Sequence, residues 1–146
     1  RKISSVPNAM VLFNPPCVLA PMPERKDFLN PENIAGLRVR MGVPLEQLSP
    51  WHHVRKGLPP TLVLHGEADP TVKFWTSAAF VKKMKAAGND AKLAAYPEEL
   101  HGFFNYGRRS NKMFIATMRR TDEFLAELGW LQGQPSIEKF TAAKAR

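Results

Sequence analysis

The sequence predicts an α/β fold in which helices flank a small parallel sheet. Three short apolar segments, Ala9–Phe13, Thr61–His65 and Ala91–Tyr96, are bounded by proline, glycine or asparagine and have the length of buried strands. Helical patterns separate them, and strands that alternate with helices are typical of a parallel sheet with right-handed crossovers. Apolar residues make up 44% of the 146 residues and charged residues 23%, which excludes a wholly disordered chain.

The first third of the chain is expected to hold one strand and one longer helix. Ala9–Phe13 reads Ala-Met-Val-Leu-Phe without interruption, which indicates burial on both faces of the sheet. After a proline-rich loop, Asn30 and Pro31 supply a helix cap and a favoured first residue, so we expect a helix over Glu32–Met41. Pro44–Leu48 has room for one or two further helical turns.

The rest of the chain alternates strand and helix. Between the second and third strands, Phe74–Ala87 has apolar positions opposite three lysines and predicts an amphipathic helix. A last helix is expected from Ser110, acting as its cap, to Leu128. Its expected buried face consists of Phe114, Met118, Leu125 and Leu128. The chain shows no internal repeat, so residues 1–131 are expected to form one unit, followed by a polar tail, 132–146, that is loosely helical or disordered.

Charge and cysteine content exclude several classes of protein and site. The net charge is +8, but the basic residues are spread along the chain without interleaved aromatic residues, so no nucleic-acid partner is expected. No apolar run approaches the roughly 18 residues that span a membrane. The single cysteine, Cys17, excludes an intrachain disulfide and a cysteine-built zinc site, and we expect neither a metal nor an organic cofactor. One thiol does not indicate a compartment, so secreted and cytoplasmic locations both stay open.

Two loops that follow predicted strands carry candidate catalytic residues. Asp69 lies four residues beyond Thr61–His65, and His101 lies five residues beyond Ala91–Tyr96. Parallel strands place their carboxyl ends at one edge of the sheet, where open α/β folds build their sites. An aspartate that accepts a hydrogen bond from Nδ1–H of a histidine forms with it the acid–base pair of a serine hydrolase.

Each candidate also has a purely structural interpretation. Asp69 alone would serve as a turn residue, and a lone histidine is more often structural than catalytic. His65, at a strand end, is expected to be buried and hydrogen-bonded. His52 and His53 are adjacent and point to different sides, so we do not expect them to bind a metal together.

The spacing His65-Gly66-x-x-Asp69-x-x-Val72, then a helix, a strand and His101-Gly102-Phe103, resembles the C-terminal part of α/β-hydrolases. The segments Asn8–Pro15 and Leu48–Val54 are similar to those of the acetyl-esterase/lipase branch of this superfamily. That branch has no sharp boundary with the prolyl-oligopeptidase-type peptidases. The resemblance implies a partial α/β-hydrolase fold whose three strands are the sixth to eighth of the family's sheet. It also implies that Asp69 is the acid and His101 the base of a carboxylesterase that acts on a small-molecule ester, possible substrates including acylated carbohydrates.

The sequence departs from this family in its nucleophile. The family places its serine in a Gly-x-Ser-x-Gly turn on the fifth strand, and none of the six serines here has glycine two residues away on either side. We therefore expect that the N-terminal half, with the nucleophile, is missing and that these 146 residues alone are inactive. Two alternatives stay open: a fragment of a prolyl-oligopeptidase-type serine peptidase, and a non-catalytic binding module. The strand Ala9–Phe13 would then leave an exposed sheet edge, through which a homodimer could form.

Overall fold

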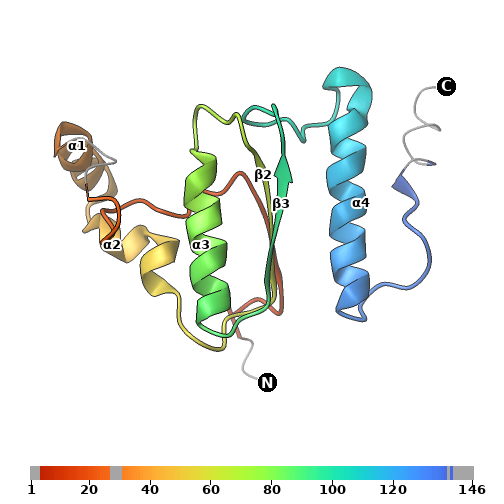
Figure 1. Cartoon of the computed structure of the whole chain (residues 1–146), viewed down its shortest axis with the longest axis horizontal. Helices are drawn as coiled ribbons and strands as arrows, with labels where there is room; N and C mark the ends of the chain where they lie inside the picture. Colours follow the sequence, from red (N-terminus) through yellow and green to blue (C-terminus); the bar gives the residue numbers. More distant parts are fainter. Residues whose placement is uncertain (1–3, 27–30, 138, 140–146) are drawn as a thin grey trace.

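The computed structural model describes residues 4–26, 31–137 and 139. Its centre is a parallel sheet of three strands in the order β1-β2-β3, comprising β1 (Met10–Phe13), β2 (Thr61–Gly66) and β3 (Ala91–Tyr96). Figure 1 shows α3 against one face of this sheet and α4 against the other. The predicted α/β architecture and all three strands are confirmed, with bounds that differ by one residue at most.

The helices lie close to the predicted segments. Their bounds are α1 (Pro31–Met41), α2 (Leu45–Leu48), the 3₁₀ turn η1 (Pro50–His53), α3 (Phe74–Ala86), the 3₁₀ turn η2 (Arg109–Asn111) and α4 (Lys112–Glu127). The sequence analysis did not predict η1, where Pro50 occupies the first position of a short turn between α2 and β2.

Strand register brings the carboxyl ends of the three strands together. Phe13 pairs with Leu64, and two residues later Gly66 pairs with Tyr96. The loops after β1, β2 and β3 therefore leave the sheet at the same edge, which is the arrangement on which the predicted site depends.

Alternating residues of β2 supply a separate core on each face of the sheet. Val63 faces α3, where it packs with buried Phe80 and Met84. Leu62 and Leu64 face α4, where they pack with Phe124. All six residues of β2 are buried, as expected for the central strand of a sheet with helices on both faces.

The inner face of α4 differs from the predicted one. Its buried residues are Thr117, Thr121 and Phe124, with Leu125 and Leu128 packed beside them. The predicted face named only apolar residues and did not include these two threonines. Each hydroxyl donates to a carbonyl of its own helix, Thr117 to Phe114 O at 3.0 Å and Thr121 to Thr117 O at 2.9 Å, so its burial leaves no unpaired donor.

The prediction that Ser110 caps α4 is wrong. Arg109, Ser110 and Asn111 all adopt positive φ angles of 43°, 55° and 62°, and the helix begins at Lys112. A serine cap needs an extended backbone, whereas the chain here makes a left-handed reversal out of the preceding loop. Asn111 Oδ1 instead accepts a hydrogen bond from the backbone N–H of Gly107.

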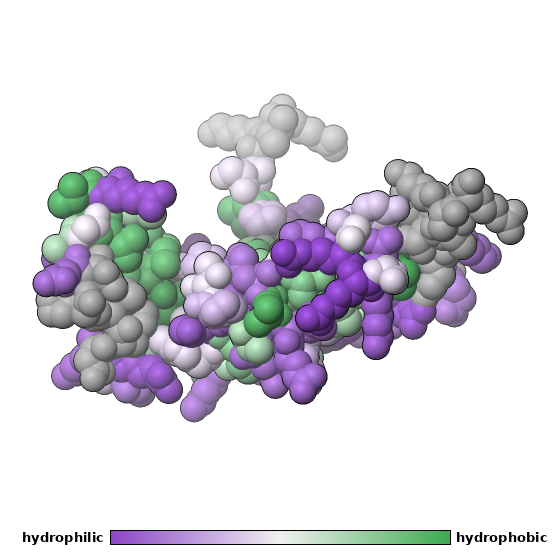
Figure 2. All heavy atoms as spheres, turned by 90° about the horizontal axis from the view of Figure 1, so that it is seen from above, coloured by the Kyte–Doolittle hydropathy of each residue, from purple (hydrophilic) through white to green (hydrophobic). Residues whose placement is uncertain are grey.

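The polar tail predicted from 132 falls partly outside the described residues, namely at 138 and 140–146. Among the described strands, β1 pairs on one side only, with β2. No helix within the described ranges has the length and apolar character needed to cross a membrane. Figure 2 shows hydrophobic side chains gathered toward the α1–α2 end of the visible face, where Val39, Met41 and Leu48 are exposed.

Candidate active site

The loops after β2 and β3 are held against each other at the edge of the sheet. The backbone N–H of Glu67 donates to Tyr96 O at 3.0 Å and thereby extends the strand pairing into the two loops. Gly66 ends β2 with its α-carbon against the Glu99 backbone, and a Cβ built there would lie 2.7 Å from the Glu99 carbonyl carbon. A side chain at this position would therefore push the two loops apart.

Asp69 is held in place by the turn that leads into α3. Its side chain is fully buried, and Oδ1 accepts hydrogen bonds from the backbone N–H groups of Thr71 at 2.8 Å and Val72 at 2.9 Å. These bonds are those of a turn-forming aspartate. The turn interpretation and the acid interpretation of Asp69 are thus compatible, because the turn uses one carboxylate oxygen and leaves Oδ2 available.

Oδ2 of Asp69 accepts a hydrogen bond from His101. The distance from His101 Nδ1 to Asp69 Oδ2 is 2.8 Å across 32 residues of sequence. Since a carboxylate only accepts, the Nδ1 of His101 carries the proton and the lone pair lies on Nε2. The side chain of His101 is 42% exposed, and among the described residues Nε2 has no hydrogen-bond partner. A proton acceptor is therefore presented to solvent and oriented by a buried carboxylate.

The charge of Asp69 is stabilised in spite of its burial. Burial by itself raises the pKa of this carboxyl group, but hydrogen bonds from Val72, His101 and Thr71 outweigh it, and the net pKa lies below the ordinary value. Asp69 is therefore an anion at neutral pH. A negatively charged carboxylate next to a histidine stabilises the positive charge that the imidazole gains when it takes up a proton.

The chain directly after His101 makes a tight turn. Gly102 has a φ of +72°, a conformation that side chains rarely adopt. The guanidinium of Arg108 donates to the carbonyls of His101 and Gly102, each at 3.2 Å. Nearby, Arg109 pairs with Glu99 at 3.0 Å. These contacts tie the backbone on both sides of His101 to the segment that leads into α4.

Asn14, the first residue after β1, also belongs to this site, although it was not predicted. It is 3% exposed, its Oδ1 accepts from the backbone N–H of Gly66 at 3.4 Å, and its Nδ2 lies 3.4 Å from His101 Nδ1. Because Nδ1 donates to Asp69, the amide of Asn14 contacts this nitrogen without donating to it. The signal in the sequence was its position at the end of a predicted strand, the same criterion that identified Asp69.

His65 and His52 make contacts only within the protein. His65 is fully buried, as predicted, and its Nδ1 lies 2.7 Å from Ser77 Oγ. His52 Nδ1 lies 2.9 Å from Ser49 Oγ and its Nε2 lies 3.0 Å from Pro21 O. Both of these serines are fully buried, so neither serine–histidine pair can meet a substrate. No group of three or more potential metal ligands occurs in the described part of the chain.

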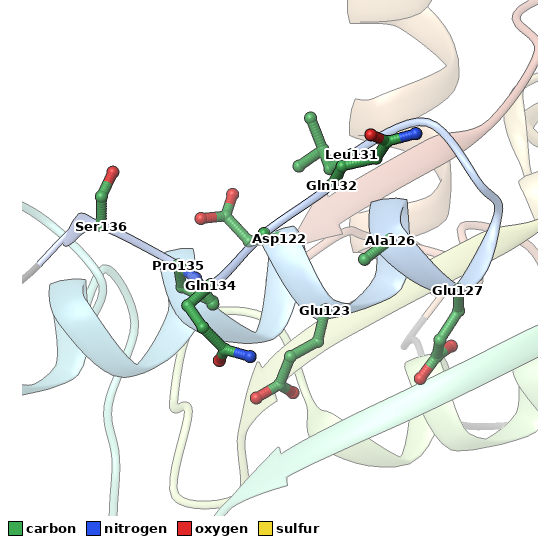
Figure 3. A pocket seen from close by; sticks show the side chains of 10 residues that line it. Asp122, Glu123, Ala126, Glu127, Leu131, Gln132, Gln134, Pro135 and Ser136 are labelled. Carbon is green, nitrogen blue, oxygen red and sulfur yellow. The ribbon is translucent and has the colours of Figure 1, made fainter.

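None of the cavities formed by the described residues is lined by His101. A cavity of about 640 Å³ lies between α4 and the segment that follows it, far along the chain from Asp69. Figure 3 shows the side chains that line it. A second cavity of about 290 Å³ adjoins the acid turn, with Thr71, Val72 and Trp75 in its lining. Neither is lined by His101, so the described residues do not by themselves enclose a substrate around Nε2.

Comparisons with known proteins agree with this geometry. The sequence model of the prolyl oligopeptidase family matches residues 40–131, which include both Asp69 and His101. Among curated proteins, none matches the chain. The chain is similar to solved structures of esterase 2 from the planctomycete Thermogutta terrifontis. The propionate-bound form is 42% identical with a TM-score of 0.80 and covers 91% of this chain and 47% of the esterase.

Two further forms of the same esterase give similar values. The butyrate-bound form is 41% identical with a TM-score of 0.79, covering 88% of this chain and 46% of the esterase. The form phosphoramylated by tabun is 40% identical with a TM-score of 0.76, covering 87% and 44%. The chain thus spans about half the length of the esterase, and the predicted partial α/β-hydrolase fold is confirmed. Together with the family match, this shows that the chain belongs to the prolyl oligopeptidase family of α/β-hydrolases.

Proposed function

We propose that this chain supplies the acid and the base of a serine carboxylic ester hydrolase. Asp69 is the acid, His101 is the base, and the nucleophilic serine belongs to a polypeptide segment outside these 146 residues. The observation that carries the proposal is the 2.8 Å hydrogen bond from His101 Nδ1 to buried Asp69, which leaves Nε2 unpartnered among the described residues and open to solvent.

His101 would transfer the protons, and Asp69 would stabilise the positive charge that His101 carries in between. Nε2 of His101 takes the hydroxyl proton of the serine as its oxygen bonds to the ester carbonyl carbon. The imidazolium formed is stabilised by the Asp69 carboxylate and then gives the proton to the departing alcohol oxygen. In the second half of the reaction His101 takes a proton from water, the hydroxide oxygen attacks the acyl-enzyme, and the proton returns to the serine oxygen.

The absence of a suitable serine in this sequence supports the second part of the proposal. Ser49 and Ser77 are buried, and no serine of the described residues forms a hydrogen bond with His101. The esterase that resembles this chain is about twice as long, as expected if the other catalytic groups lie on its unmatched half.

The substrate class proposed is an ester with a short acyl group. The solved esterase structures similar to this chain include forms with propionate and with butyrate bound. A peptidase is the second candidate, because the family whose sequence model matches the chain takes its name from prolyl oligopeptidase. Comparing p-nitrophenyl acetate with a prolyl peptide anilide in the protein that carries the nucleophile separates these two substrates.

Labelling with a fluorophosphonate tests the proposal, since this reagent forms a covalent bond with activated serines. The 146-residue chain should remain unlabelled, whereas the protein extended to include a Gly-x-Ser-x-Gly segment should bind one equivalent. In the extended protein, His101→Ala should abolish labelling while His53→Ala, which alters an exposed histidine whose Nε2 lies 2.9 Å from Gln47 O, should not. Labelling of the 146-residue chain at a serine would contradict the proposal.

A further inference from the structure

We infer that His65 is a positioning residue, which holds the Asp69 carboxylate in the orientation that accepts the hydrogen bond from Nδ1–H of His101. The inference rests on the function proposed above and assigns a role to the histidine that the sequence analysis treated as a core residue. His65 lies in β2, and its side chain, like that of Asp69, is fully buried. Its Nε2 lies 3.3 Å from Asp69 Oδ2.

The partners of the His65 ring determine where its proton lies. Nε2 is 2.9 Å from the carbonyl oxygen of Val72, and a carbonyl can only accept, so Nε2 carries the proton. The N–H is directed at Val72 O, and the ring nitrogen that carries it lies 3.3 Å from Asp69 Oδ2, so its partial positive charge is close to the carboxylate. Nδ1 is consequently an acceptor, and it receives the hydroxyl proton of Ser77 at 2.7 Å. A flip of the buried ring would leave both nitrogens without a matching partner.

Three hydrogen bonds and one close contact then define the orientation of the Asp69 carboxylate. Backbone N–H groups hold Oδ1, His101 Nδ1 donates to Oδ2 at 2.8 Å, and His65 Nε2 lies 3.3 Å from the same oxygen. Without His65, Oδ2 would lose this second, positively polarised neighbour. The carboxylate could then rotate away from His101, and the proton of His101 would no longer be confined to Nδ1.

His65 also joins the three elements on which the position of Asp69 depends. The ring belongs to β2, its Nε2 contacts the acid turn at Val72, and its Nδ1 contacts α3 at Ser77. The ring of Phe74 packs edge-on against it, with ring centroids 5.8 Å apart. An apolar side chain could fill the same space, as Leu64 does on the other face of β2, but it could not make these hydrogen bonds.

Nitrogen-15 NMR of the ring nitrogens in the 146-residue chain tests the inference without requiring any catalytic activity. In alkaline buffer, the wild-type chain should show His65 as the Nε2–H tautomer and His101 as the Nδ1–H tautomer. A His65 that carries its proton on Nδ1 would overturn the inference before any variant is made.

Variants of His65 separate the Nε2 donor from general effects of burial. His65→Gln places an amide nitrogen near the position of Nε2, and His101 should keep its Nδ1–H tautomer. His65→Asn places an amide nitrogen near the position of Nδ1, and His65→Leu has no donor. In both of these, His101 should lose the Nδ1–H signal and shift toward the Nε2–H tautomer.

A matched control corrects for lost stability. Phe80→Leu removes volume from the α3 core without contacting Asp69 and should leave the His101 signals unchanged. A folded His65→Leu or His65→Asn chain in which His101 keeps its Nδ1–H tautomer would overturn the inference. Fluorophosphonate labelling tests the proposed esterase function, whereas the NMR measurement tests the role of His65. The two results are independent because the tautomers of His65 and His101 do not depend on a nucleophile.

Discussion

Gly66→Ala should separate the two loops of the candidate site. A Cβ at residue 66 would lie 2.7 Å from the Glu99 carbonyl carbon and closer still to its oxygen, whereas real Cβ atoms essentially never approach other heavy atoms within 3.0 Å. The obstructing atoms belong to the backbone, so no side chain can rotate to relieve the overlap. One of the two loops must therefore move.

The expected cost follows from this overlap. Overpacking of a core costs roughly 1–3 kcal/mol, and an overlap with backbone belongs at the upper end, about 3 kcal/mol. In a domain of this size each kcal/mol changes the melting temperature by roughly 2–4 °C, so Tm should fall by about 6–12 °C. Circular dichroism during heating measures Tm, and ring nitrogen NMR reports whether His101 still donates to Asp69.

Gly36→Ala is the matched control for the same change of residue. Gly36 lies in α1, and a Cβ there meets no atom within 4 Å. Alanine is the better helix former by about 1 kcal/mol, so this variant should be slightly more stable than the wild type. The reasoning is refuted if Gly66→Ala melts within one or two degrees of the wild type and His101 keeps its hydrogen bond to Asp69.

The other predictions concern the acid, the thiol and the α4 core. The pKa of Asp69 is lower in the folded chain than its ordinary value, so its ionisation stabilises the fold above about pH 4 and this contribution disappears as the pH falls through the folded pKa. Urea unfolding of wild type and Asp69→Asn should differ at neutral pH and converge in acid, and a constant difference would contradict this. Burial raises the pKa of Cys17 to about 12, so iodoacetamide should modify it only after unfolding; rapid modification of the folded chain would refute its burial. Phe124→Ala should cost about 3–5 kcal/mol because the ring is fully buried against Leu62 and Leu64. The control Trp130→Ala, at a side chain that is 52% exposed, should cost far less in the same urea titration.

The strands could be predicted from the sequence because their apolar runs fit few other structures. Continuous apolar runs such as Thr61–His65 can be buried only at the centre of a sheet with helices on both faces, and β2 is buried along its whole length. The start of α4 was mispredicted because Ser110 has the chemistry of a cap, but the reversal after His101 imposes a left-handed backbone there. That constraint comes from contacts with the preceding loop, such as those of Arg108 with His101 O and of Arg109 with Glu99, which lie outside the cap pattern of the helix itself.

The candidate site was partly visible in the sequence for a similar reason. The positions of Asp69 and His101 after their strands predicted that they would meet, and their side chains lie 2.8 Å apart. Asn14 and the Nε2 contact of His65 were not foreseen, since both depend on which way a side chain turns at the end of a strand. Strand order and register place a residue at the edge of the sheet, but side-chain orientation follows from packing against neighbouring elements.

Ester hydrolysis by the protein that includes the nucleophile is the most direct test of the central claim, that Asp69 and His101 are an acid and a base. Initial rates with p-nitrophenyl acetate should fall by about 10⁴-fold or more in His101→Ala and by about 10⁴-fold in Asp69→Asn, while KM changes little. The double variant should be no worse than His101→Ala, because the two residues act as a unit. Full activity of His101→Ala would contradict the account.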